Sequence, residues 1–214
     1  DNGKKEKLET YDMGKFNGEY FHWFNNGDVE ENGYYKYDGE YSNRDSLFTS
    51  YYKNGQIEQQ GNYKDDKKIG KWSWYYENGN VEMQGSFKGY NSIGEPEKNG
   101  LWIYGEDDGE REEITLVNGE REGSYNKFYA NGQHCEKGSY IFNYDEDTSF
   151  KHGMWTWWRE DGNKINEGEY DNGIKTGKWS YWENGNLYQE GSHEGVDDWG
   201  EPIKTGYWKF YYYY

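Results

Sequence analysis

Aromatic and polar residues alternate along short stretches of this chain, and the stretches end at Asn-Gly or Asp-Gly. Residues 70–79 read Gly-Lys-Trp-Ser-Trp-Tyr-Tyr-Glu-Asn-Gly, and residues 153–162 read Gly-Met-Trp-Thr-Trp-Trp-Arg-Glu-Asp-Gly. A period of two predicts a β-strand with one aromatic face. Asn-Gly or Asp-Gly beside such alternation is a strong hairpin signal. The pattern therefore predicts strands joined in hairpins.

Seven of the Asn-Gly and Asp-Gly dipeptides share the same position relative to these alternating stretches, and they divide the chain into hairpin units. Their turn glycines are Gly27, Gly55, Gly79, Gly109, Gly132, Gly162 and Gly185. Asn, Asp and Gly all tolerate a positive φ angle, so we expect two-residue type I′ turns at these points.

Two further glycines hold fixed places in the units. A leading glycine lies nine residues before the turn glycine, as in Gly70, but Ser46 takes its place in the second unit. In the seventh unit Gly177 lies eight residues before the turn, a one-residue deletion. A trailing glycine lies six residues after the turn glycine, as in Gly61, with Thr115 replacing it in the fourth unit.

The spacing between units alternates between short and long, so the hairpins come in pairs with a period of about 53 residues. We predict one tandem-repeat array over residues 1–214, with about seven hairpins and a half-repeat at each end. The expected fold is all-β: an elongated, single-layer antiparallel sheet of tandem β-hairpin repeats.

The pattern Gly-x-Trp-x-x-Tyr-x-x-Asn-Gly-x-x-x-x-x-Gly-x-Tyr resembles the MORN-type repeat over about residues 3–214. It is most similar to the bacterial variant in the YwqK family of antitoxin-like proteins. The resemblance is weakest at residues 100–119, where Gly105 and Arg111 replace expected apolar residues and a bulge is expected. It implies a sheet of successive hairpins and a protein-binding or scaffolding role, with toxin neutralisation in the YwqK branch. It supplies no catalytic residues.

Composition narrows the possible partners. Aromatic residues make up 21 % of the chain and all hydrophobic residues 32 %, so flat rings rather than aliphatic side chains must form the core. A net charge of -17 disfavours nucleic acid and anionic membranes and favours a basic protein partner or simple solubility. No apolar run approaches the ~20 residues of a membrane-spanning helix, so we expect no membrane insertion.

Candidate chemistry is sparse. The four histidines lie far apart in the sequence, and no nucleophile–base spacing or paired-cysteine motif is present. We therefore expect no enzyme activity and no cofactor. Acidic clusters give weak calcium candidates at Asp145, Asp147, Asp197 and Asp198, although solvated loop charge is the favoured interpretation.

A stripe of aromatic residues is the candidate binding site. It is either the packing layer of the sheet or a surface that stacks on sugars or a quaternary ammonium group. The members of this aromatic stripe are Tyr20, Trp72, Trp74, Trp102, Tyr125, Trp155, Trp157, Trp179, Tyr181 and Trp208.

Three functions are consistent with the sequence. The first is a non-catalytic scaffold for protein–protein interaction, with possible self-association of terminal strands into an extracellular fibre. The second is an acidic antitoxin or immunity protein that neutralises a basic toxin, which would be cytoplasmic. The third is binding of cell-wall carbohydrate or choline through exposed rings. Because the chain begins at Asp1 without Met, we expect an exported or cell-surface protein in the first and third cases.

Overall fold

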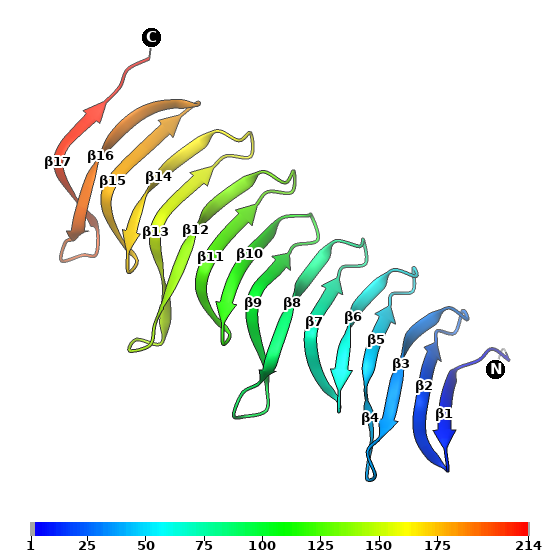
Figure 1. The fold of residues 1–214 in the computed structure, drawn as a ribbon. Helices are drawn as coiled ribbons and strands as arrows, with labels where there is room; N and C mark the ends of the chain where they lie inside the picture. Colours follow the sequence, from blue (N-terminus) through cyan, green and yellow to red (C-terminus); the bar gives the residue numbers. More distant parts are fainter. Residues whose placement is uncertain (1–2, 214) are drawn as a thin grey trace. The chain divides into compact units, whose positions relative to one another are not determined.

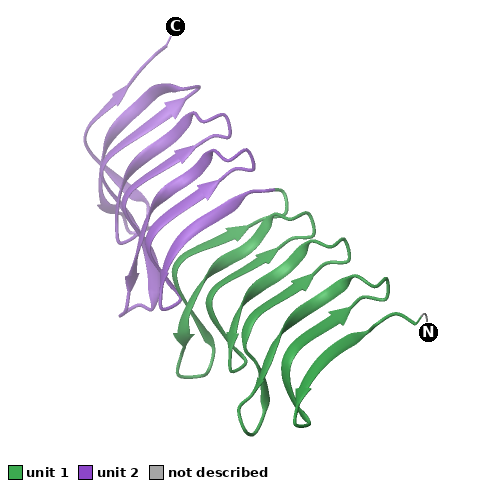
Figure 2. Cartoon of the chain, turned by 45° about the vertical axis from the view of Figure 1, so that its right-hand side comes forward, with its two compact units in different colours: residues 1–108 green, residues 109–214 purple. Residues whose placement is uncertain are grey.

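The chain folds entirely into β-hairpins. The computed structural model describes residues 3–213, which contain seventeen strands in one antiparallel sheet and no helix (Figure 1). Among these residues there is accordingly no helix that could cross a membrane. The all-β prediction is confirmed. Contacts group the chain into two compact units, residues 1–108 and 109–214 (Figure 2), and the prediction of one continuous repeat array stays a prediction.

In unit 1 the strands pair antiparallel in chain order, except that β4 and β5 do not pair with each other. Its β3 pairs with both β4 and β5, because these two are one strand interrupted at Asp45. The strands are β1 (Lys7–Asp12), β2 (Lys15–Trp23), β3 (Val29–Tyr37), β4 (Ser42–Arg44), β5 (Ser46–Tyr51), β6 (Ile57–Lys64), β7 (Lys67–Tyr75), β8 (Val81–Tyr90) and β9 (Pro96–Gly105).

Unit 2 repeats this arrangement with longer strands. Its β10 shows a register shift at Thr115 opposite β11, which is the same irregularity that other strand pairs show and does not set residues 100–119 apart. The strands are β10 (Arg111–Val117), β11 (Glu120–Phe128), β12 (His134–Asn143), β13 (Thr148–Trp158), β14 (Lys164–Asp171), β15 (Ile174–Glu183), β16 (Asn186–Val196) and β17 (Pro202–Phe210).

The Asn-Gly and Asp-Gly turns differ from the type I′ prediction at most positions. In the turns ending at Gly27, Gly55, Gly79, Gly132 and Gly162, the glycine has φ of 84–96° but the preceding Asn or Asp has no positive φ. In one example the Gly55 N–H donates to the Tyr52 carbonyl at 2.9 Å, and the Tyr52 N–H donates to the Gln56 carbonyl at 2.8 Å. These are type I turns followed by a left-handed glycine, which adds one residue to the loop.

Type I′ turns occur elsewhere. Asn184 and Gly185 have φ of 50° and 80°, and Glu183 pairs directly with Asn186, so the deletion in the seventh unit produces a two-residue turn. The opposite ends of the strands also carry such turns, for example at Asp65-Asp66 and Asn172-Gly173.

Leading glycines mark bulges. Gly61 pairs with Trp72 and Asn62 pairs with Ile69, so Gly70 and the residue after it have no partner on the preceding strand. Gly70 has φ of 61°, a conformation that glycine adopts without strain. Bulges bend a strand and increase its twist, and the strands of each unit are visibly curved (Figure 1).

Candidate functional site

One face of each unit is an aromatic ladder. In unit 1, Tyr63 and Trp72 have ring centroids 4.9 Å apart, and Phe87 and Trp102 have centroids 5.1 Å apart, both edge to face. In unit 2, Tyr170 and Trp179 repeat this geometry at 5.3 Å. Edge-to-face pairs contribute about 0.5–1.5 kcal/mol beyond the area they bury. In five hairpins the residue two positions after the trailing glycine thus packs its ring against a tryptophan of the following strand.

Each tryptophan of the ladder lies flat on a trailing glycine of the preceding strand. A Cβ atom added to Gly61 would lie 2.1 Å from the Trp72 ring, and one added to Gly138 would lie 2.2 Å from the Trp155 ring. The Trp72 Nε1–H then donates to the carbonyl oxygen of Asn62 at 3.0 Å. The trailing glycine therefore provides the space in which the indole ring is buried.

A basic side chain covers the other side of each ring. Lys68 Nζ lies 4.3 Å from the Trp72 ring centroid, Lys151 Nζ 4.1 Å from that of Trp155, and Lys204 Nζ 4.2 Å from that of Trp208. The same geometry holds for the pairs Lys98–Trp102 and Lys175–Trp179. The sequence signal is Lys-x-Gly-x-Trp, present five times, and sequence reasoning missed it.

Burial divides the aromatic stripe into two groups. Trp72, Trp102 and Trp155 have no exposed surface, Trp179 is 1 % exposed and Tyr125 is 4 % exposed, so these rings pack the sheet. The partly exposed members are Tyr20, Trp74, Trp157, Tyr181 and Trp208. Even here the face of Trp74 and of Trp157 already has a lysine ammonium within 5 Å, from Lys68 and Lys151. A quaternary ammonium ligand would have to displace these side chains.

His193 occupies the ladder position that is usually Tyr. Its ring is 6 % exposed and lies between Trp179 and Trp208, with centroids 6.1 Å and 5.1 Å away. Burial lowers the pKa of His193, and the charges of Lys175 and Lys204 lower it further. The ring is thus kept neutral as a packing element.

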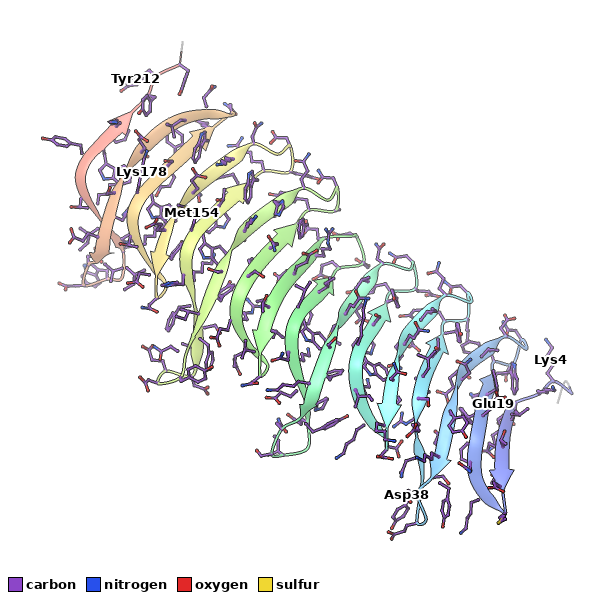
Figure 3. The ribbon with its side chains drawn as sticks, in the orientation of Figure 1. Lys4, Glu19, Asp38, Met154, Lys178 and Tyr212 are labelled. Carbon is purple, nitrogen blue, oxygen red and sulfur yellow. The ribbon has the colours of Figure 1, made fainter. Side chains whose placement is uncertain are left out.

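The opposite face of the sheet, which we call the outer face, has a different character. The residue directly after each leading glycine position, one before the ladder aromatic, is exposed in every hairpin. Figure 3 labels three of these residues: the acidic Glu19, the apolar Met154 and the basic Lys178. The set is Glu19, Leu47, Lys71, Leu101, Ser124, Met154, Lys178 and Tyr207.

The acidic clusters lie in turns. Asp145 and Asp147 are in the β12–β13 turn, and Asp197 and Asp198 are in the β16–β17 turn. Asp197 accepts the N–H groups of Trp199 and Glu201, both at 2.9 Å, which is a turn-closing role. In the part of the chain that the structure describes, no three His, Cys, Asp or Glu residues are grouped so that they could hold a metal ion.

Comparison with known proteins identifies the repeat. The model of the MORN repeat variant family matches five segments: residues 44–65, 68–88, 121–141, 151–172 and 175–194. A search of curated proteins gave no match. One similar solved chain is from "Crystal Structure of TcdB2-TccC3-Cdc42", with 11 % identity and a TM-score of 0.23 over 92 % of this chain. This chain spans 12 % of that one, and so low a score supports no functional argument.

Proposed function

We propose that this chain, which belongs to the MORN repeat variant family, is a non-catalytic scaffold that binds a basic protein partner through the outer face of its hairpins. The observation that carries the proposal is the contrast between the two faces. Two residues after each leading-glycine position every hairpin has an aromatic residue, and in five of the eight hairpins this is a tryptophan held between a trailing glycine and a lysine. One residue earlier, on the outer face, the side chain is always exposed and changes from Glu to Leu, Lys, Ser, Met or Tyr.

A constant frame with a variable exposed face is the arrangement by which repeat proteins present binding surfaces. Leu47, Leu101 and Met154 are 51 %, 54 % and 53 % exposed, so each places apolar surface among polar residues without contributing to the aromatic ladder. Such mixed surfaces are typical of non-obligate protein interfaces. The excess of 41 acidic over 24 basic residues favours a basic partner by electrostatic complementarity.

The test is capture of a partner by the purified chain from an extract of its source cells, followed by direct binding to that partner. Leu101→Asp and Met154→Asp should weaken the binding at least about tenfold, as expected for residues at the centre of an interface. Ile93→Asp is the matched control, because Ile93 is 77 % exposed in the β8–β9 loop and lies off the outer face.

Equal binding by all three variants would refute an outer-face interface. Light scattering on the purified chain distinguishes the related outcome of self-association. If the scattering mass rises with protein concentration, and Leu101→Asp and Met154→Asp abolish that rise, the partner is a second copy of the chain.

A further inference from the structure

The turn at Asn184-Gly185 differs from the other Asn-Gly turns on its rim of the sheet in a way that bears on chemistry. An asparagine followed by glycine can cyclise, because glycine has no side chain to block attack of its backbone nitrogen on the asparagine side-chain carbon. Three groups take part: the glycine N–H, the asparagine Oδ1 and the asparagine Nδ2, which leaves as ammonia.

In the three-residue loops all three groups are held by hydrogen bonds. At Asn54 the Oδ1 accepts the Gln56 N–H at 2.9 Å, and the Nδ2 donates to the Glu77 carbonyl of the next turn at 2.7 Å. The Gly55 N–H donates to the Tyr52 carbonyl at 2.9 Å.

The turns at Asn78 and Asn131 repeat this pattern. Their Nδ2 groups donate to the Asp107 and Glu160 carbonyls at 2.7 Å and 2.9 Å. Their Oδ1 atoms accept the backbone N–H two residues later in the chain. The N–H of the glycine that follows each asparagine donates at 2.8 Å to the carbonyl three residues before that glycine. Nucleophile, electrophile and leaving group are therefore all restrained.

At Asn184 the one-residue deletion removes these restraints. The turn has two residues, its strand partners are Glu183 and Asn186, and both Asn184 and Gly185 are exposed. Within residues 3–213, neither the Asn184 side chain nor the Gly185 N–H has a hydrogen-bond partner. All five turn asparagines of this rim are exposed, so exposure does not distinguish Asn184.

We propose that Asn184 is the preferred site of self-catalysed deamidation among the Asn-Gly turns of this rim. Hydroxide removes the Gly185 amide proton, the nitrogen attacks Cγ of Asn184, and Nδ2 leaves as ammonia after taking up a proton, which gives a five-membered succinimide. Water then opens the ring at one of its two carbonyls, so the products are aspartate and isoaspartate.

The product changes the sheet at this turn. Isoaspartate adds a main-chain carbon to a two-residue loop that joins β15 and β16, and either product adds a negative charge to a chain of net charge -17. Loss of the two-residue geometry loosens the register of a hairpin, because loop length fixes strand pairing.

The experiment is incubation of the folded chain at mildly alkaline pH, followed by peptide mapping that separates aspartate from isoaspartate at each asparagine. Asn184 should convert at least about tenfold faster than Asn54, Asn78 and Asn131, a factor that corresponds to one hydrogen bond of about 1.4 kcal/mol. Asn172 is an internal control, because its turn is also type I′ but the Gly173 N–H donates to the Lys151 carbonyl at 2.8 Å.

A parallel incubation in urea separates fold from local sequence. In the unfolded chain the same asparagines should convert at similar rates. Equal rates in the folded chain would overturn the proposal, and so would a preference for Asn184 that persists in urea, because sequence alone would then account for it.

Discussion

At the scale of single residues, the glycines of the repeat have two distinct roles. Trailing glycines such as Gly138 have ordinary backbone angles but no room for a side chain, because an indole ring lies against them. Leading glycines such as Gly100 have room but a left-handed backbone, with φ of 78° and no heavy atom within 4 Å of an added Cβ. The same residue type is thus required in one place by packing and in the other by backbone conformation.

Gly138→Ala should destabilise unit 2 by about 3 kcal/mol, because the added methyl group would lie 2.2 Å from the Trp155 ring and must displace it. The free energy of unfolding from urea titration measures the loss, and tryptophan fluorescence reports displacement of the ring. Gly89→Ala is the control. Gly89 lies in β8 with no atom within 4 Å of an added Cβ and no positive φ, so its replacement should change stability little.

Ser46→Gly should stabilise the protein by about 1 kcal/mol. Ser46 stands in a leading-glycine position and has φ of 72°, a region that strains any residue with a Cβ atom. Thermal unfolding of the variant tests this. Gly70→Ala introduces the same strain at a site with open space and should lower stability by a similar amount. A destabilising effect of Ser46→Gly would show that the Ser46 side chain, which donates to Asp45 at 3.3 Å, outweighs the strain.

At the scale of the strand, the Lys-x-Gly-x-Trp segment forms a local unit of packing. The bulge at the leading glycine bends the strand, so that the side chain of Lys68 lies over the ring of Trp72, four residues later in the same strand. Burial opposes this arrangement, since it lowers the pKa of Lys68 and of Lys175. The attraction to the ring must therefore offset desolvation of the ammonium group.

Lys151→Met should reduce stability by about 1 kcal/mol, because it keeps the apolar stem but removes the charge over the Trp155 and Trp157 rings. Urea titration measures this change. Lys137→Met is the matched control on the neighbouring strand β12, where the lysine is exposed and pairs in register with Thr156. Equal effects of the two substitutions would mean that the loss of a surface charge, rather than the ring contact, sets the result.

The sequence predicts strands, hairpins and the aromatic face because these depend on local alternation and on glycine spacing. It does not predict the turn type at Asn54-Gly55, since type I and type I′ turns both accept Asn before Gly and the choice depends on loop length set by the strand register. It also left the burial of Trp72 undecided. Whether a ring faces a ligand or a glycine of the next hairpin depends on contacts between hairpins, which no single repeat contains.

At the scale of the whole molecule, charge and tyrosine burial act together. The chain already carries a net charge of -17, and each tyrosine that ionises adds to the repulsion. Burial raises the pKa of Tyr63, Tyr125 and Tyr170, and it raises the pKa of Tyr181 to about 12. In both units, therefore, folding keeps these tyrosine hydroxyl groups protonated at a higher pH than in the unfolded chain.

These shifts predict a loss of stability in alkali. An unfolded tyrosine has a pKa of about 10, so the folded state binds more protons than the unfolded state between that pH and the folded pKa. The resulting stability is complete below pH ~10 and falls as pH rises toward 12. Urea titrations at a series of pH values measure it, with phenolate absorbance to report ionisation.

Tyr181→Phe should make the decline of stability with pH shallower, because one such group is removed. Added salt should recover only the part of the loss that comes from repulsion, since screening acts on exposed charge and not on desolvation of a buried ring. Stability that stays constant up to pH 12 would contradict the placement of the tyrosines in the buried ladder.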